Sequence, residues 1–513
     1  MTVGDWLDAA IATVFPKAGA ARAQARQEIA SRHAAKAIYE GATTGRRGAS
    51  FRRRATDANA ETRGQLGPLR DGSRDFMRNN PWAARGKQAI SHNVVGSGIL
   101  PHAEGGTETA RETAETLLVE HFDSVAVDAD GRADLYGLQM AILSAVVESG
   151  EVLVRRRRRR VEDGLPLPFQ LQVLEPDFLD SHRDGPLSGG GRIVQGVEFD
   201  AIGRRAAYWL FPEHPGGISA GMVTGMTSRR VPAGDVAHIY RMDRPGQVRG
   251  VPWLAPVMLR LRDFADYEDA QLMRQKIAAC FAAFERDVDG GGAATSPLTG
   301  AAGGNDPAVQ EHLEPGLIQK LGPGRTIEFA NPPSVDGFRD YSATQLRAIA
   351  TGLGITYEAL SGDLSNVNFS SARMGWLEMQ RNVDVWRWHL LAPQFLAPLE
   401  RWFLEAGRVS GRLTQPVGLR WTAPRREMID PTREVPANRD AVRSGQKTPS
   451  DLVRESGRDP AAHWSEYQAD METLDRLGLV LDSDARRVSR AGTTHGQVTP
   501  EMLGASDDPA QTE

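Results

Sequence analysis

The feature that most constrains the fold is a long helical run from about Trp253 to Phe284. At about 1.5 Å per residue, a helix of that length is a rod of about 45 Å. A rod of this length in a globular chain needs packing partners along its whole length. The apolar residues near helical spacing are Leu254, Val257, Met258, Leu261, Phe264, Ala265, Leu272, Ile277 and Phe281.

The segment before this helix has a strand-like pattern. Residues 135–149 have helical spacing, and from Glu151 the spacing changes to alternation. PFQLQVLE places Phe169, Leu171 and Val173 on one face of a strand and Gln170 and Gln172 on the other. RIVQGVEFD and RAAYWLF repeat the alternation between Gly-rich turns. The sequence therefore predicts an α+β fold with a mostly antiparallel sheet.

The N-terminal part is expected to be helical and basic. Residues 1–100 carry 16 Lys or Arg against 8 Asp or Glu, a net charge of +8, although the whole chain has −5. This asymmetry indicates either contact with a polyanion or charge-complementary contacts between subunits. PLRDGSRDFMRNNPWAARGKQAI resembles one helix with Phe76, Trp82, Ala83 and Ile90 on its apolar side, followed by a turn at Gly96 and Gly98 into a strand.

The region after the long helix alternates between loops and helices. A Gly-rich insertion precedes two expected strands around Gly322–Gly324, and a helix is expected near Asp340 to Gly352. A Trp-rich helical stretch then runs to about Ala406, where Pro393 and Pro398 predict a kink or a break. Short helices are expected between Pro431 and Leu481, with a start signal at Thr448–Asp451, and the tail after Asp482 is expected to be disordered.

Composition excludes several protein classes. The sequence has no apolar run approaching the roughly 20 residues of a membrane span, and its first segment has Asp5 and Asp8 where a signal peptide would be basic or apolar. The single cysteine, Cys280, excludes a disulfide framework and is expected to be a small buried residue of a reducing compartment. We therefore expect a cytoplasmic product without a membrane partner.

One acidic cluster is the nearest approach to a metal site. EPDFLDSHRD contains Glu175, Asp177, Asp180, His182 and Asp184, but alternate positions after a strand point to different faces. We interpret it as a structural turn, with a nuclease-like metal site as the alternative. The P-loop pattern is absent, and we assign no catalytic, cofactor or metal residue.

The run Arg155–Arg160 is the most unusual local feature. On a strand, alternate side chains face opposite sides, so only Arg155, Arg157 and Arg159 can line one groove. The run indicates either a solvated or subunit-facing strand or a contact with nucleic acid.

Six segments, taken in order, resemble the lambda family of tailed-phage portal proteins and together span nearly the whole chain. They are PKAGAARAQAR, RDFMRNNPWAARG with VVGSGI, VEFDAIGRRAAYWLF, HIYRMDRPGQVRGVPWLAPVMLRLRDFADYEDAQL, LEPGLIQKLGPGRTIEFANPP and GITYEALSGDLSNVNFSSARMGWLE. The resemblance implies a non-enzymatic protein without a cofactor: a dodecameric ring at one capsid vertex of the virion, assembled in the host cytoplasm. Double-stranded DNA would be packaged and ejected through it. The implied partners are the terminase large subunit, head-tail connector proteins, and the major capsid and scaffold proteins.

The resemblance also implies a division of the chain. It predicts an N-terminal arm (1–90), a mixed α/β wing (91–252), a stem helix (253–284), a small α/β clip (285–336) and a returning antiparallel stem helix (337–360). A tunnel loop (361–373), a wing/tunnel helix (374–430), a helical crown (431–481) and a disordered tail (482–513) follow. The tunnel loop would carry Asp363, Asn366, Asn368, Ser370, Ser371 and Arg373.

A polar loop without a cationic cluster suits a conduit, since strong pairing with phosphates would stall sliding DNA. We expect Arg373 to pair within the protein instead. Two alternatives stay open: a monomeric nucleic-acid-binding adaptor that uses the basic segments, and a metal-dependent nuclease built on the acidic cluster.

Overall fold

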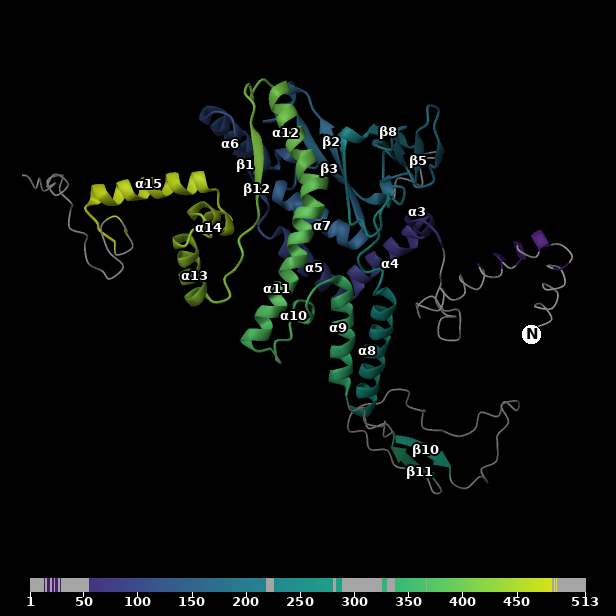
Figure 1. Ribbon diagram of the computed structural model, residues 1–513. Helices are drawn as coiled ribbons and strands as arrows, with labels where there is room; N and C mark the ends of the chain where they lie inside the picture. The colour runs from purple at the N-terminus through teal and green to yellow at the C-terminus, as the bar shows by residue number, and fades with distance from the viewer. Residues whose placement is uncertain are drawn as a thin grey trace, which may run out of the picture. The chain divides into compact units, whose positions relative to one another are not determined.

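Figure 1 shows a computed structural model of the chain. It describes residues 55–217, 226–279, 337–365, 367–481, 484 and 486, the strand backbones at 283–287 and 325–329, and scattered helical positions between 13 and 28. Cys280 and the tail from 487 lie outside the described residues. The chain divides into two compact units, Met1–Ala60 and Glu61–Glu513, and the second contains every sheet of the described part.

A three-stranded antiparallel sheet lies at the centre of the second unit, in the order β3-β2-β9. Its strands are β2 (Glu151–Arg158), β3 (Phe169–Leu174) and β9 (Val236–Tyr240). Val152 and Val154 of β2 are buried in the larger core, to which helices α5 (Pro81–Val95) and α7 (Leu135–Ser149) also contribute. Leu153 points to the opposite face and belongs to a second, smaller core.

The smaller core is shared with a five-stranded antiparallel sheet in the order β4-β5-β6-β7-β8. Its strands are β4 (Gly185–Pro186), β5 (Arg192–Val194), β6 (Val197–Phe199), β7 (Arg205–Leu210) and β8 (Arg229–Pro232). Val197, Tyr208 and Val231 lie in this core together with Leu153. The mixed α/β character and the antiparallel pairing confirm what the alternating patterns predicted.

The predicted single helix around Phe76 and Ile90 is two helices, α4 (Leu66–Asn79) and α5. The break has a local cause: Oδ1 of Asn80 accepts hydrogen bonds from the backbone N–H groups of Trp82 and Ala83, and Pro81 occupies the first turn of α5. After the predicted turn at Gly96, β1 (Leu100–Glu104) pairs with β12 (Gly418–Thr422).

A buried ionic cluster holds the two sheets together. Glu151 on β2 is about 1% exposed, and its carboxylate accepts hydrogen bonds from Nη2 of Arg249 at 2.6 Å and from Nε2 of His238 at 2.9 Å. The guanidinium of Arg249 also donates to the carbonyl of Gln195. Burial alone would raise the pKa of Glu151, but Arg249 and His238 hold it well below its usual value, so the carboxylate is ionised.

Two glycines allow the segment after Arg249 to lie against β2. A Cβ atom on Gly250 would lie 2.2 Å from the carbonyl oxygen of Gly150, and one on Gly150 would lie 2.3 Å from the carbonyl carbon of Val251. Gly150 also has φ of +88°, a conformation that other residues rarely adopt. The backbone N–H of Gly250 donates to Glu151 at 2.8 Å, which fixes this approach.

The long helix is shorter than predicted. Helix α8 spans Met258–Ala279, and Trp253–Val257 form turns, because Pro256 disfavours the helical conformation of the residue before it. Phe284 falls in strand β10 (Ala283–Asp287) instead, which pairs with β11 (Arg325–Phe329). The second of the two strands expected around Gly322–Gly324 is therefore present as β11, and its described partner is β10. The first expected strand, at residues 315–321, lies outside the described part.

Helix α9 (Phe338–Leu353) confirms the helix expected near Asp340–Gly352 and lies antiparallel to α8 (Figure 1). The rings of Tyr267 and Tyr341 are 4.6 Å apart, and Nη1 of Arg260 donates to Gln345 at 2.6 Å. The pair leaves apolar side chains uncovered: Leu272 of α8 is 54% exposed and Met273 is 58% exposed.

The prolines of the Trp-rich stretch do not break it. Helix α11 (Phe369–Val385) continues through a π-helix, η7 (Trp386–Leu396), into α12 (Ala397–Val409) (Figure 1). Pro393 lies inside the π-helix, where the wider turn accommodates a residue that cannot donate to an α-helical hydrogen bond. Arg387 of this segment is buried and donates to the carbonyl oxygen of Val94 at the end of α5.

The C-terminal part consists of short helices, as predicted. They are α13 (Pro431–Arg443), α14 (Pro449–Glu455) and α15 (Pro460–Leu477). The predicted start signal is a capping box, in which Thr448 and Asp451 each accept a hydrogen bond from the other's backbone N–H.

The remaining described elements are short, with the exception of α6. They are α3 (Ala58–Thr62), α6 (Glu108–Phe122), α10 (Tyr357–Ser361), and the 3-10 turns η2 (Val125–Val127), η3 (Val161–Asp163), η4 (Pro176–Phe178) and η6 (Ala233–Asp235). None of the described helices is both long and apolar enough to span a membrane.

We predict that Arg249→Met destabilises the protein by about 3–5 kcal/mol, because it leaves the Glu151 carboxylate buried without its main partner. Arg412→Met provides the control, since Arg412 forms an exposed ion pair with Glu120 at 3.1 Å that is worth about 0–1 kcal/mol. The measurement is the free energy of unfolding from urea denaturation followed by circular dichroism. Equal losses in the two variants would contradict the importance of the cluster.

A second prediction concerns acid. Burial lowers the pKa of both His121 and His238 from 6.5 to about 4, so each binds a proton in the unfolded chain before it does in the folded chain. The contribution of these two histidines to the free energy of unfolding is therefore complete above pH 6.5 and falls as the pH is lowered from 6.5 to 4.

His121→Phe isolates this effect, because the ring of His121 packs against Phe122 and Phe169 and makes no hydrogen bond within the described part of the chain. We expect this variant to lose about 3 kcal/mol less than the parent between pH 7 and pH 4. His182→Phe, at an exposed position, should leave the pH profile unchanged. Thermal denaturation across this pH range tests both, and identical profiles for parent and His121→Phe would disprove the assignment.

Candidate functional site

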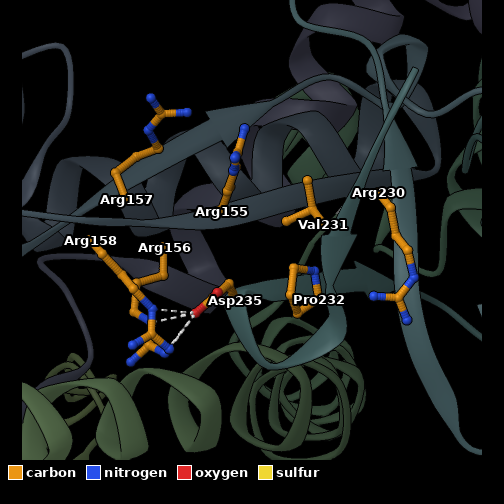
Figure 2. A pocket seen from close by; sticks show the side chains of 8 residues that line it. All are labelled: Arg155, Arg156, Arg157, Arg158, Arg230, Val231, Pro232 and Asp235. Carbon is orange, nitrogen blue, oxygen red and sulfur yellow. Dashed lines mark hydrogen bonds and ion pairs between the residues drawn. The ribbon is translucent and has the colours of Figure 1, made fainter. Parts of the chain in front are cut away.

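The arginine run forms the outer half of β2, and its side chains alternate between two faces of the sheet. Arg156 and Arg158 point toward α12 and are neutralised there (Figure 2). Arg156 lies 2.6 Å from Asp235 and 2.7 Å from Glu405, and Arg158 lies 3.1 Å from Asp235. These two arginines are therefore part of the packing between the sheet and the helix.

Arg155 and Arg157 point away from Asp235, on the opposite face (Figure 2). They lie opposite Gln172 and Gln170 of β3, and the only side-chain hydrogen bond that Arg157 makes within the described residues is a long one, 3.5 Å, to Gln172. Neither arginine has a carboxylate partner in the described part of the chain. They line a cavity of about 300 Å³ together with Arg156, Arg158, Asp235 and three residues of β8, Arg230, Val231 and Pro232.

The two faces differ in electrostatics. Burial alone would raise the pKa of Asp235, but hydrogen bonds from Arg156 and Arg158 lower it, which indicates compensated charge. Burial, followed by repulsion from Arg157, lowers the pKa of Arg155, and Asp235 offsets this only in part. Arg155 and Arg157 thus hold positive charge without an ion-pair partner in the described part of the chain, although Asp235 also lines the cavity.

Of the three arginines predicted to line one groove, Arg155, Arg157 and Arg159, the structure brings the first two together. Arg155 and Arg157 share the cavity, whereas Arg159 lies beyond the end of β2 and its Nε donates to Gln170 at 2.8 Å. The sequence did not identify Asp235 and Glu405 as partners of the other face. Strand alternation predicted that the run divides into two sets, but no local signal connects β2 with Glu405, which is 249 residues away from Arg156.

The predicted tunnel loop is shorter than expected. Asn368 is the N-cap of α11: its Oδ1 accepts the backbone N–H of Ser371 at 2.8 Å, and the Ser371 hydroxyl accepts the backbone N–H of Asn368 at 3.1 Å. This reciprocal cap starts the helix at Phe369, so Ser370, Ser371 and Arg373 lie in its first two turns. The expectation that they belong to a loop was wrong.

The remaining loop is held in place at Asp363. Its carboxylate accepts hydrogen bonds from the Tyr357 hydroxyl and from the backbone of Ser365, both at 3.0 Å. The hydrogen bonds with Ser365 lower the pKa of Asp363, so the exposed loop carries a fixed negative charge. Asn366 lies outside the described residues.

The pairing expected for Arg373 is not found among the described residues. Arg373 is exposed on α11 and makes no ion pair within the described part of the chain. The described part of the loop and the first turns of α11 therefore present polar groups, the Asp363 carboxylate, the Arg373 guanidinium and the exposed side chains of Leu364 and Met374.

The acidic cluster does not converge on one point. Asp177 and Glu175 both bind Nη2 of Arg74, at 2.6 and 3.0 Å, and His214, which the sequence did not suggest, lies 3.0 Å from Glu175. Asp180 accepts a hydrogen bond from the Ser228 hydroxyl, and Asp184 pairs with Arg63. Three ligating groups, Glu175, Asp177 and His214, lie within 4.8 Å of one another, but a guanidinium already neutralises the two acids. This arrangement does not support the nuclease alternative.

Comparisons with known proteins agree with the resemblance. The family model described as "Phage portal protein, lambda family" matches residues 44–387. The chain is 25% identical over 451 residues to a probable portal protein of Halomonas phage phiHAP-1, covering 83% of this chain and 84% of that one. It is 24% identical over 336 residues to portal protein B of Escherichia phage lambda, covering 58% and 61%.

Among solved structures, a chain of the neck of a native GTA particle, computed with C12 symmetry, is similar with a TM-score of 0.40 and 15% identity, covering 76% of this chain and 94% of that one. No inference about this chain rests on that likeness. The lambda-family portal protein is a structural, non-catalytic component of the phage head. Because the family model covers more than half of the sequence, this chain belongs to the lambda family of phage portal proteins.

Proposed function

We propose that twelve copies of the chain close into a ring at one vertex of the phage head, and that double-stranded DNA passes through the ring during packaging and ejection. The observation that carries this proposal is the antiparallel pair of α8 and α9. Leu259, Leu272 and Met273 of α8 are all more than half exposed. Full burial of a side chain of this kind is favourable by about 1.5–3 kcal/mol, and neighbouring copies in a ring would bury these side chains.

In this ring the arm, wing, stem, clip, tunnel loop and crown would occupy the ranges that the resemblance implies. The clip, residues 285–336 with β10 and β11, would dock the terminase large subunit and later the head-tail connector proteins. Major capsid and scaffold proteins would surround the ring during assembly in the host cytoplasm.

The loop before α11 would face the DNA. Its fixed carboxylate, Asp363, repels phosphates, and its other described residues are uncharged, with hydrogen-bonding side chains at Ser361, Ser365 and Asn368. A wall of this kind lets a duplex slide, since duplex DNA carries one charge per roughly 1.7 Å and would be held by a cationic wall.

Ring closure provides the first test. We expect Leu272→Asp with Met273→Asp to reduce the fraction of closed rings in negative-stain electron microscopy more than tenfold, because a buried carboxylate at the contact is costly. Ile202→Asp is the matched control: Ile202 is 73% exposed in the turn between β6 and β7, and its change should leave ring formation intact. A parent chain that remains monomeric at high concentration and with scaffold would favour the nucleic-acid-binding adaptor.

The second test addresses the DNA path. Asp363→Lys exchanges the fixed negative charge for a positive one in every subunit, so we expect less nuclease-protected DNA per particle and slower packaging. Asp130→Lys changes the charge by the same amount at another exposed acid and should have no effect. Equal DNA content in both variants would exclude Asp363 from the DNA path.

A further inference from the structure

The cavity between β2 and β8 is bounded by an open strand edge. β8 is the last strand of its sheet, so one of its backbone edges has no neighbouring strand among the described residues. Its residues Arg230, Val231 and Pro232 form one wall of the cavity, and Arg155 and Arg157 lie on the β2 wall. β8 has only four residues and Pro232 has no N–H, so an additional strand would find backbone donors at Arg229–Val231 only.

The charge of this cavity is balanced only in part within the described chain, because the single carboxylate among its lining residues, Asp235, faces five arginines. Of the five arginines that line it, Arg156 and Arg158 bind Asp235, and Arg230 binds Glu198 at 2.8 Å. Arg155 and Arg157 remain without a carboxylate in the described part, and burial of Arg155 makes its positive charge costly. An incoming anion would offset that cost.

We propose that this cavity is a docking groove for an extended acidic segment of another protein, which adds to β8 as a strand and places a carboxylate between Arg155 and Arg157. Val231 faces the interior between the two sheets, so alternate residues of an added strand would face the same side. Backbone pairing with β8 would supply affinity, and the two guanidinium groups would select acidic side chains at the inward positions. The proposal does not depend on ring formation.

Two observations favour a peptide from another protein over the alternatives. A duplex cannot pair with a strand edge, and a cavity of about 300 Å³ with Val231 and Pro232 in its wall admits side chains rather than a duplex. On β1, β2 and β6 of a second copy the acids are already engaged: Glu104 with Arg420, Glu151 with Arg249, and Glu198 with Arg230. Strand β10 is already paired with β11.

The test uses the full-length chain and a fluorescent nine-residue peptide in which glutamate alternates with valine. We expect fluorescence anisotropy to show binding that weakens with salt and is reduced at least tenfold by Arg155→Gln with Arg157→Gln. The matched control, Arg132→Gln with Arg204→Gln, removes the same charge from two exposed arginines elsewhere and should change the Kd less than twofold. A peptide of equal charge with two valines replaced by proline should bind at least tenfold more weakly, because proline cannot donate to the strand edge.

Several results would overturn the proposal. Absence of peptide binding to the parent chain, or equal binding of the proline-containing peptide, would exclude strand addition. Equal losses in the two double variants would show attraction to bulk charge only. Displacement of the peptide by duplex DNA, with DNA binding lost in the Arg155 and Arg157 variant, would make the groove a nucleic-acid contact, and loss of rings in that variant would make it a contact between copies.

Folding of the variants is checked by circular dichroism and by an unchanged thermal midpoint. If the double variant does not fold, Arg157→Gln alone is used, because Arg157 lies nearer the outer end of β2. This single change should still weaken peptide binding several-fold, and an unchanged Kd would count against the proposal.

Discussion

The ion pair between Glu151 and Arg249 is the interaction on which the rest of the structure depends. It lies between the two sheets, and both side chains are almost completely excluded from solvent. Arg249 also donates to the carbonyl of Gln195, beside the small sheet, while Glu151 accepts from His238 of β9. The same carboxylate receives the backbone N–H of Gly250, from which the chain runs to Trp253 and into α8. One buried charge pair thus sets the positions of both sheets and of the long helix.

This cluster also explains why the segment HIYRMDRPGQVRGVPW is distinctive without being catalytic. His238, Tyr240, Gln247 and Arg249 all form hydrogen bonds within the cluster or its surroundings. Nδ1 of His238 lies 3.1 Å from a donor of Arg205, so its Nε2 carries the proton that Glu151 accepts. These four side chains are buried, and their hydrogen bonds hold the interior of the fold together.

Local patterns predicted the parts of the fold that depend on local physics. Alternation located β3, and the Thr448–Asp451 signal located the start of α14, because strand faces and caps are set by neighbouring residues. The sequence could not predict that β11 pairs with β10 across the intervening insertion, or that Pro393 is accommodated by a π-helix, since both depend on tertiary packing. In the candidate site, the division of the arginines by face was predictable, but Glu405 and His214 reach their partners only in the folded chain. The cap formed by Asn368 and Ser371 was a local signal, and it was missed.

The continuous helix from α11 through η7 to α12 has a mechanical consequence. Its first turn carries Ser370 and Ser371 beside the polar loop. Its far end carries Glu405, which accepts a hydrogen bond from Arg156 of β2. These points are about 50 Å apart along the helix, at about 1.5 Å per residue. A π-helical segment is a defined site of bending in such a helix. A displacement of the first turn of α11 that is not absorbed at Trp386–Leu396 therefore moves the helix end that anchors β2.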